Sequence, residues 1–356
     1  MAAELPVRHL MVGEEQMKRL EKDVWSDKFV SCQLAGSRGR ANAKVRYRGG
    51  HTRSYSKRSY EVVCGGKTYH YNAEFDDPSL IRNALSFQFF EWIGVPSPKT
   101  RHVQLLLNGR SLGVYLELEG VEKPFFRKRG IAVESLFYAV NDHANFGLTA
   151  AGSSRRKTSL FDGYQQMIGT GADRRRLVLF VRRLNGKGAS ASKELHGYLT
   201  RRLDIDNYLR WLAGAVLTGN YDGFDQNYAV YRHKPTGKYR IIPWDYEGTW
   251  GRNCYGKACG SDLVRIKGYN RLTGRLMQYG SVRRQYKALL QRLLRTSFTE
   301  QRILPVVKSM HESIRPYVYR DTERKWTFST FEGEPEFIRH YIEERRRLIA
   351  EGLREL

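Results

Sequence analysis

The segment formed by residues 220–251 constrains the fold of this chain more than any other. It reads NYDGFDQNYAVYRHKPTGKYRIIPWDYEGTWG. The pattern predicts a short strand over 228–232, a turn at HKPTG and a second strand over 238–244. Because a tight hairpin folds back on itself, the residues just outside its two ends become neighbours in space. We therefore expect the loop before the first strand and the residue after the second strand to share one small volume.

Three polar side chains flank this predicted hairpin, namely Asp222, Asn227 and Asp245. Two carboxylates and an amide oxygen form a hard-oxygen site suited to Mg²⁺, which keeps its remaining positions for water and phosphate. Protein kinases arrange a catalytic Asp, an Asn five positions on, a hairpin and a metal-binding Asp in the same order. In that template Asp222 orients or deprotonates an acceptor hydroxyl, while Asn227 and Asp245 hold the metal.

The match to the kinase template is incomplete. The letters before Asp222 are NY rather than HR, Asp245 is followed by YEG rather than FG, and no APE motif follows. Asp and Asn are also common in ordinary turns. The spacing by itself therefore leaves open a polar loop in which Asp222 only caps a helix or a turn.

A second segment places cations beside two glycines. Arg48, Gly49 and Gly50 are followed by Arg53 and Lys57. Glycines let the backbone approach a ligand closely and cations can meet phosphate oxygens, so this loop is a candidate cover for a triphosphate. We expect Lys57 to be an exposed cation at the loop edge, whose removal leaves the fold intact. Two glycines between strands also form ordinary hairpin turns, and the loop alone does not decide between these interpretations.

The remaining pattern predicts an α+β fold. Strands are expected first, over 43–48, 59–64, 68–72, 101–107 and 112–119. Among them lies a helix with Asp77 as its N-cap and Pro78 at its first position, which ends at Gly94. Strands around one helix are typical of a small nucleotide-covering lobe. Beyond about residue 120 the chain turns helical, with broken helices and loops over 141–200 and helices over 205–217, 281–294, 299–317 and 335–353.

Two local signals indicate how these elements connect. The pair Asn108-Gly109, between two expected strands, is a strong signal of a type I′ hairpin. Asp204 is placed to cap the helix over 205–217, which leads directly into the loop carrying Asp222. A helix also precedes the catalytic loop of kinases.

Composition narrows the classes of protein to consider. The chain has 356 residues, of which 41% are hydrophobic and 12% aromatic, so it can bury a substantial core. Its formal net charge of +24 favours polyanionic partners such as nucleic acid, nucleotide phosphates, acidic protein or an anionic surface. The basic residues are spread along the whole chain rather than gathered in one groove-shaped patch. Charge alone therefore does not select nucleic acid, which we do not expect as the partner.

The N-terminal segment and the cysteines argue against other classes. The start of the chain carries charged residues early and lacks the apolar stretch of a signal peptide, and no apolar run is long enough to cross a bilayer. We expect a protein made in a cytoplasm, without a membrane partner. Four scattered cysteines are too few for a disulfide scaffold. Cys254 and Cys259 have no second ligand pair at zinc-binding spacing.

Several long segments together resemble the spore coat protein H (CotH) family. In order, they are RGGHTRSYSKRSYEV, NAEFDDPSLIRNALSFQFFEWIGVPSPKT, NGRSLGVYLELEGVEK, LFYAVNDHANF, NYDGFDQNYAVYR and IIPWDYEGTWGR. Their order and spacing match from near the N-terminus to the final helices, so the resemblance covers nearly the whole chain. It rests on several segments rather than on one short motif.

The resemblance implies an atypical protein-kinase-like, two-lobed fold. One catalytic domain would span residues 1–356, with a small strand-rich lobe over about 1–120 and a larger, mainly helical lobe over about 121–356. It implies a kinase that uses ATP and Mg²⁺, with Mn²⁺ able to replace Mg²⁺, to phosphorylate serines in other spore coat proteins. These substrates would be rich in Ser and in Lys or Arg. The protein would be made in the mother-cell cytoplasm and assembled into the spore coat.

The resemblance also assigns roles to individual residues. The catalytic Asp of the family maps to Asp222, the metal-binding Asp to Asp245, and the second metal ligand to Asn227 by position. The basic residues near the first loop map to Arg48 and Lys57.

Two other functions remain open at this point. The first is a structural or polyanion-binding coat component with a degenerate site, which the net charge of +24 would suit. The second is another nucleotide-dependent transfer on the same fold, in which AMP moves instead of the γ-phosphoryl group.

Overall fold

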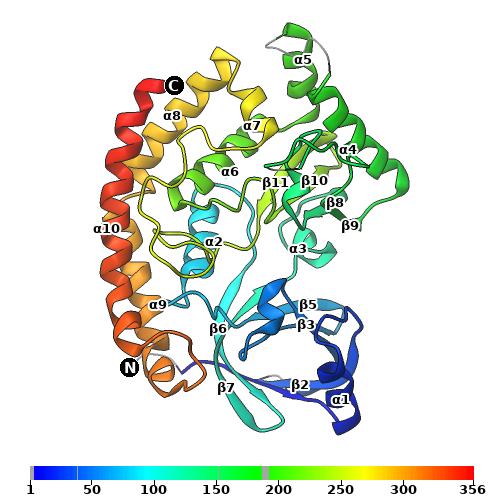
Figure 1. Cartoon of the computed structure of the whole chain (residues 1–356), viewed down its shortest axis with the longest axis vertical. Coiled ribbons are helices and arrows are strands. Elements are labelled where there is room, and N and C mark those ends of the chain that lie inside the picture. Colours follow the sequence, from blue (N-terminus) through cyan, green and yellow to red (C-terminus); the bar gives the residue numbers. More distant parts are fainter. Residues whose placement is uncertain (1–3, 38, 151, 187–191) are drawn as a thin grey trace.

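The computed structural model describes residues 4–37, 39–150, 152–186 and 192–356. Figure 1 shows a strand-rich part at one end of the molecule and a larger part, built from helices around a second sheet, above it. The α+β content agrees with the sequence prediction. Over the residues described, no helix combines the length and the apolar character needed to cross a membrane.

The strand-rich part is a closed barrel of seven strands. Their order around the barrel is β1 (Val7–Met11), β2 (Val30–Gly36), β3 (Gly39–Arg48), β4 (Ser59–Cys64), β5 (Lys67–Asn72), β7 (Arg110–Glu119) and β6 (Thr100–Leu107). Neighbours are antiparallel except β1 and β6, which pair in parallel and close the barrel. The helix α1 (Glu14–Lys22) joins β1 to β2. The sequence prediction missed β1 and β2, so closure distinguishes this part from the small kinase lobe we expected.

Apolar side chains from alternate strand positions fill the barrel, as period-two patterning requires. Val45, Val62, Leu105 and Tyr115 are among its buried residues. The turn between β6 and β7 is the predicted Asn-Gly hairpin, since Asn108 has φ 49° and Gly109 has φ 86°. Two successive positive φ values are the mark of a type I′ turn.

The helix α2 (Arg82–Trp92) leaves the barrel and packs in the core of the larger part. It begins at Arg82 and not at Pro78 as predicted. The Asp77 carboxylate accepts hydrogen bonds from the backbone N–H of Ser79 (2.8 Å) and Arg82 (2.9 Å). Leu80 adopts a left-handed φ of 56° between them. Asp77 therefore bonds the first residue of the helix across an intervening turn. Because this turn separates Asp77 from the helix, local propensity alone did not predict that the helix begins at Arg82.

The second sheet has the strand order β11-β10-β8-β9. Its strands are β8 (Val133–Ala139), β9 (Tyr164–Ile168), β10 (Tyr228–His233) and β11 (Lys238–Pro243). The helices around it are α3 (Lys123–Lys128), α4 (Gly171–Leu184) and α5 (Lys193–Arg202). The stretch over 141–200 is thus more regular than predicted, apart from positions 151 and 187–191, which lie outside the described residues.

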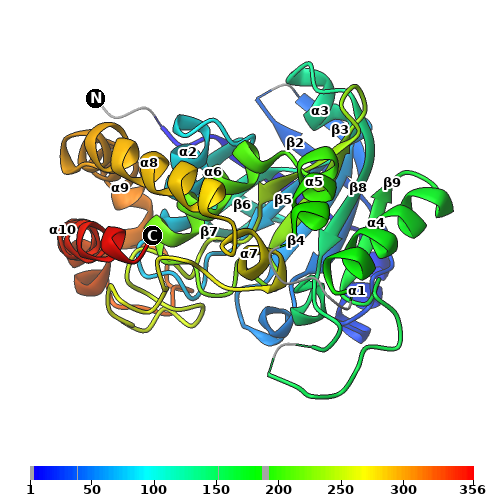
Figure 2. The same ribbon diagram turned by 90° about the horizontal axis from the view of Figure 1, so that it is seen from above.

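The remaining helices are α6 (Ile205–Thr218), α7 (Arg271–Leu276), α8 (Gly280–Thr296), α9 (Glu300–Arg320) and α10 (Phe328–Gly352). Short 3-10 turns are η1 (His51–Ser54), η2 (Asp142–Ala144) and η3 (Leu353–Glu355). As predicted, Asp204 caps α6 by accepting a hydrogen bond from the Asn207 N–H at 3.1 Å. Figure 2 shows α8, α9 and α10 on one flank of the molecule, and α4 and α5 with β9 on the other. The buried α6 lies between them and points its C-terminus at the loop before β10.

Candidate functional site

The predicted hairpin forms, and it joins two of the three predicted site residues. β10 and β11 are antiparallel with Tyr228 opposite Pro243. The pairing continues one step further, because the Trp244 N–H donates to the Asn227 carbonyl oxygen at 3.1 Å. Asn227 and Asp245 both have a left-handed φ of 59°. Such values are uncommon outside glycine and gather at functional sites, where the surrounding structure holds them in place.

The loop carrying Asp222 is held at both ends. At its start, α6 ends at Gly219 with φ 72°, and the Asn220 N–H donates to the Ala215 carbonyl at 3.0 Å. A Cβ on Gly219 would lie 2.5 Å from the hydroxyl of Tyr341 on α10, so both conformation and space require glycine here. Further on, the carbonyl of the buried Phe224 accepts a hydrogen bond from Asn270 at 2.9 Å. The half-buried Asp222 lies between these anchors.

The charges of Asp222 and Asp245 act on each other. The pKa of Asp245 is raised, first by burial and then by repulsion from Asp222, and it is partly lowered by Arg48 and His51. A carboxylate feels these neighbours only at short range in a partly buried site. The structure therefore brings Asp222, Asp245 and Arg48 together, with Asn227 next to Asp245 across the hairpin.

Two further carboxylates, which the sequence analysis did not assign to the site, join this group. Burial raises the pKa of Glu247 well above its usual range, with added repulsion from Asp245 and Glu74. Burial and the nearby Asp77 raise the pKa of Glu74 to about 8. Glu74 lies in the segment NAEFDDPS and Glu247 in PWDYEG, so the sequence shows both carboxylates. Only the fold shows that the two segments meet.

The carboxylates around this group are not all alike. Asp76 pairs with Lys325, and Asp77 pairs with Arg82 at 2.6 Å. Over the residues described, Glu74, Asp245 and Glu247 form no ion pair; Glu74 instead accepts hydrogen bonds from the Asn83 amide at 3.0 and 3.1 Å. The inner carboxylates thus have no cation of the described residues paired with them, and the raised pKa values mean that they hold protons more readily than ordinary carboxylates.

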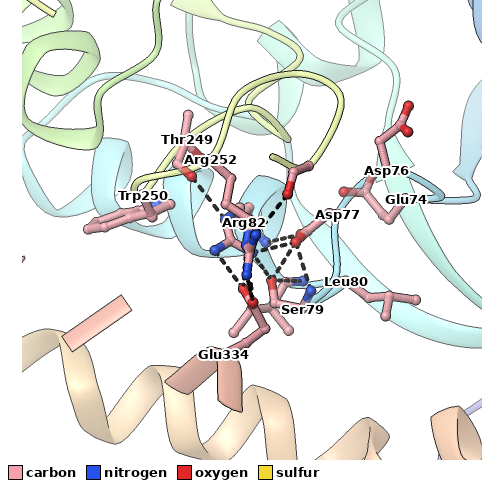
Figure 3. Close-up of polar contacts among 12 residues, drawn as sticks. Glu74, Asp76, Asp77, Ser79, Leu80, Arg82, Thr249, Trp250, Arg252 and Glu334 are labelled. Carbon is pink, nitrogen blue, oxygen red and sulfur yellow. Dashed lines mark hydrogen bonds and ion pairs between the residues drawn. The ribbon is translucent and has the colours of Figure 1, made fainter. Parts of the chain in front are cut away.

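The backbone after Asp245 is fixed by α2 and α10, as Figure 3 shows. The buried Arg82 donates to the Thr249 carbonyl at 2.9 Å and pairs with Glu334 of α10 at 2.6 Å. Tyr246 donates its N–H to Asn83 at 2.6 Å, and its ring packs edge-on against Phe90 of α2. These contacts hold the position of Asp245 through its neighbours.

The basic loop, defined as residues 48–58, contributes one cation to the site. Arg48 hydrogen-bonds the Asn72 side chain, and its guanidinium lies 5.7 Å from the centre of the Trp244 ring. Gly49 has φ 107°, and a Cβ there would lie 2.1 Å from the Thr52 hydroxyl. Nothing lies within 4 Å of a Cβ placed on Gly50. Close backbone approach is therefore open at Gly50, whereas Gly49 is needed for the turn.

The predicted location of Lys57 is wrong. Its ammonium group is buried, 2.6 Å from Asp321 and 3.1 Å from the Val114 carbonyl, with a side chain only 3% exposed. Asp321 is the residue that ends α9, far along the chain, so this ion pair ties the barrel to the larger part. Lys57 is therefore not an exposed cation at the loop edge, because its ammonium group is paired with Asp321.

Arg53 is also engaged elsewhere. It donates to the Gly49 carbonyl at 2.8 Å, to the Trp25 carbonyl at 2.8 Å and to Asp27 at 2.7 Å. These partners place its guanidinium on the side of the link between α1 and β2. Arg53 therefore supports the conformation of the basic loop, and a role at a phosphate would require it to leave these bonds.

A second acidic group lies on the other side of Asp222. Burial, Asp142 and Asp222 raise the pKa of Asp225 to about 6, and only Lys157 acts in the opposite direction. The Lys157 ammonium group donates to the Asn145 side chain at 2.7 Å and to backbone carbonyls of the same loop. The Lys157 ammonium group therefore stabilises the loop, and its positive charge only partly offsets the negative charges of Asp142 and Asp225.

The residues present fit a Mg²⁺ ion. Over the described residues, no three His, Cys, Asp or Glu side chains converge closely enough to form a metal site on their own. Mg²⁺ commonly takes only one or two carboxylates and completes its shell with water and substrate phosphates. The carboxylate of Asp245 and the amide oxygen of Asn227 are donors of this kind, and a bound cation would favour the ionised forms of the nearby Glu74 and Glu247. The thiol of Cys254, whose pKa burial and Asp222 raise to about 12, adds no anionic ligand.

Comparison with known proteins adds to this geometry. The family model described as CotH kinase protein matches residues 45–349. Inner spore coat protein H of Bacillus subtilis (strain 168) is 39% identical and is covered over 98% of each chain. Inner spore coat protein H-like protein of the same strain is 26% identical, covering 98% of this chain and 99% of that one.

A solved structure also aligns, that of the Helicobacter pylori proinflammatory kinase CtkA. The alignment covers 83% of this chain and 92% of that one, with 10% identity and a TM-score of 0.35. A similarity this low carries no argument about fold or activity. The family model and the coat protein relatives confirm the resemblance seen in the sequence: the chain belongs to the CotH kinase protein family.

Proposed function

We propose that this protein is a kinase that transfers the γ-phosphoryl group of ATP, with Mg²⁺, to serine residues of other spore coat proteins. The observation that carries the proposal is that Asp222 and Asp245 interact from opposite ends of one hairpin, beside Glu74 and Glu247, which form no ion pair among the described residues. Membership of the CotH kinase protein family and the coat protein relatives support it.

The proposed roles follow from the position of each group. Asp222, on an anchored loop, holds the acceptor hydroxyl and takes up its proton. Asp245 and the Asn227 amide are the metal ligands, and bound Mg²⁺ would neutralise phosphate charge. Arg48 and the backbone at Gly50 face the phosphates from the barrel side. Positioning and charge neutralisation supply most of the catalysis in phosphoryl transfer, so this small set is sufficient.

The proposed reaction balances with these groups alone. The serine oxygen forms a bond to the γ-phosphorus of ATP while the bond from that phosphorus to the bridging oxygen breaks. ADP leaves with the electron pair, and the hydroxyl proton passes to Asp222. Lys57 has no part in this scheme, because its ammonium group is buried against Asp321.

The acidic group beside Asp222 supports the substrate class that we propose. Substrates rich in Lys or Arg would be repelled by a protein of net charge +24 unless negative charge lies at the acceptor site. Asp142 and Asp225 provide such charge near Asp222. We therefore propose that cations flanking the acceptor serine bind on this side of the site, while the phosphates of ATP lie on the side of Asp245.

The test is incubation of the protein with labelled ATP, Mg²⁺ and a Ser-rich, Lys/Arg-rich coat protein, followed by mass spectrometry of the product. A phosphate adduct on serine supports the proposal. An AMP adduct would show that the nucleotide lies in the opposite orientation. If no adduct forms and the Asp222→Asn variant binds polyanions as the wild type does, the protein is a structural coat component instead.

A further inference from the structure

The barrel contains a cavity of about 560 Å³ at one open end, separate from the candidate site. Strand alternation along β5 separates the two. Tyr69 and Tyr71 line the cavity, whereas His70 and Asn72, on the opposite face of the strand, contact Trp244 and Arg48. We call this space at the open end of the barrel the mouth cavity. The proposed site for ATP and the mouth cavity therefore lie on opposite sides of one sheet.

Cations from five elements or their ends surround the mouth cavity. They are Arg8 of β1, Arg40 of β3, Lys67 of β5, Lys99 and Arg101 at the start of β6, and Lys128 of α3. Residues so far apart in the sequence reach one opening only because the barrel closes. The charge here is thus a product of the fold, unlike the basic residues scattered over the rest of the surface.

The carboxylates that line the same cavity are already engaged. Glu117 accepts two hydrogen bonds from Arg8, at 2.6 and 3.1 Å. Glu119 pairs with Lys128 at 2.9 Å and is also bonded by Arg129. Glu122 accepts a hydrogen bond from the Thr68 hydroxyl at 2.9 Å. Glu117 and Glu119 therefore offset the cations that they bind, Glu122 is bonded by a hydroxyl, and Lys99 pairs with Glu91 at 2.7 Å outside this lining.

Three cations of the rim remain without a partner. Within the described ranges, Arg40, Lys67 and Arg101 form no ion pair, and all three side chains are exposed. Deeper in the cavity, the buried hydroxyl of Tyr71 lies beside Arg8 and Glu117. Unpaired cations from separate strands at the rim of one cavity are a feature that an anionic ligand would satisfy.

We propose that the mouth cavity is a binding site for a phosphate-bearing ligand, held by Lys67 and Arg101 at the rim. Its volume lies within the range of roughly 300–1,000 Å³ that is typical of ligand pockets, for which barrel mouths are a common location. The site also lies beside the link from β7 to α3, where the Gly120 N–H donates to the Thr68 carbonyl at 3.0 Å. A ligand bound here would lie beside the stretch through which β7 leads into α3 and β8, since Gly120, Glu122 and Pro124 also line the cavity.

The experiment measures binding in excess chelator, so that the metal-dependent site proposed for ATP does not contribute. The probes are inorganic triphosphate and a phosphoserine peptide, which share the phosphate group and represent its two sources. Isothermal titration at physiological ionic strength compares the wild type with a Lys67→Ala/Arg101→Ala variant. A matched control, Arg284→Ala/Arg295→Ala, removes two exposed arginines from α8.

We expect one of the probes to bind saturably with one molecule per chain. The mouth variant should weaken its affinity by about tenfold or more, since it removes charge-assisted hydrogen bonds to the phosphate. The α8 control should leave the affinity nearly unchanged. Equal weakening in both variants, or binding that does not saturate, would mean that the net charge alone attracts the probes and would overturn the proposal. Because the site for ATP is not involved, this outcome leaves the proposed kinase function untouched.

Discussion

The two sides of the candidate site differ in how their charges are satisfied. On the side of the larger part, Asp245, Glu247 and Glu74 are crowded, and burial and mutual repulsion raise their pKa values. On the side of the barrel, Lys57 is paired with a buried carboxylate and Arg53 is held by three hydrogen-bond acceptors. The carboxyl groups on one side have no paired cation, whereas on the other side Lys57 and Arg53 are engaged and Arg48 is the cation that acts on Asp245.

This difference indicates where the function and the stability of the protein reside. Repulsion among buried carboxylates costs stability unless a cation binds, and perturbed groups of this kind gather at functional sites. A buried, fully paired lysine serves the fold. We therefore expect substitutions on the carboxylate side to affect ligand binding and transfer. Substitutions of Lys57 and Arg53, which are already bonded within the protein, should affect folding.

The largest effect should come from the two carboxylates at the ends of the hairpin. Asp222→Asn removes the group that accepts the hydroxyl proton, so transfer should fall by about 10²–10⁴ while ATP affinity with Mg²⁺ is mostly kept. Asp245→Asn removes a metal ligand, so affinity and transfer should fall together. Rates of phosphate incorporation and equilibrium titrations with ATP measure the two quantities separately.

Both changes are isosteric, and circular dichroism should show that both variants stay folded. If Asp222→Asn loses nucleotide affinity as severely as Asp245→Asn, then Asp222 is a metal ligand and the role given to it here is wrong. Full transfer activity in both variants would contradict the kinase function altogether.

The next effect concerns stability on the barrel side. Lys57→Ala leaves Asp321 buried without a partner, and breaking a buried ion pair typically costs about 3–5 kcal/mol in the free energy of unfolding. The control is Lys18→Ala, which removes an exposed pair with Glu14 on α1 and should cost about 0.5 kcal/mol or less. Urea unfolding measures both.

A second variant separates loss of the ion pair from general damage to the loop. Lys57→Met/Asp321→Asn removes both charges and should recover much of the stability lost in Lys57→Ala, because no buried charge is left unpaired. Should Lys57→Ala unfold at the same urea concentration as the wild type, the ion pair would not be the tie between the two parts that the structure indicates.

A smaller effect is expected in the pH dependence of stability. The Glu74 pKa of about 8 lies above the 4.5 of an unperturbed Glu, so between these values the folded state binds a proton that the unfolded state does not. The free energy of unfolding should therefore fall as pH rises from about 4.5 to about 8. Glu74→Gln removes this contribution, and its advantage over the wild type should grow across that window.

Thermal melts from pH 5 to about pH 9 would measure this, with Glu21→Gln on the exposed face of α1 as the control. Parallel curves for the wild type and Glu74→Gln would mean that Glu74 is not protonated in the folded protein. The crowding of carboxylates on this side of the site would then be less severe than we infer.

Sequence reasoning succeeded where the interactions are local. The β10–β11 hairpin, the Asn108-Gly109 turn and the Asp204 cap each depend on residues a few positions apart. Their propensities and spacing therefore predicted them directly. The meeting of Asp222 and Asp245 follows from the hairpin for the same reason.

Sequence patterns did not predict contacts between residues that lie far apart in the chain. Lys57 and Asp321 are separated by 264 positions, and nothing near Lys57 in the sequence indicates its partner. Closure of the barrel depends on β1 pairing with β6, which is equally non-local. Glu74 and Glu247 join the site only because the fold brings their segments together. Local patterns give no information about such pairings.

The central claim is that the site around Asp245, whose carboxyl groups have no paired cation, binds a divalent cation and so admits ATP. A thermal-shift titration tests it most directly, because a ligand that binds only the folded state stabilises it, by about 2.7 kcal/mol when it is present at a hundred times its Kd. We predict that ATP with Mg²⁺ raises the melting temperature of the wild type, that ATP in excess chelator does not, and that Asp245→Asn loses the Mg²⁺-dependent shift. An equal shift with ATP in the presence and absence of chelator would contradict the account.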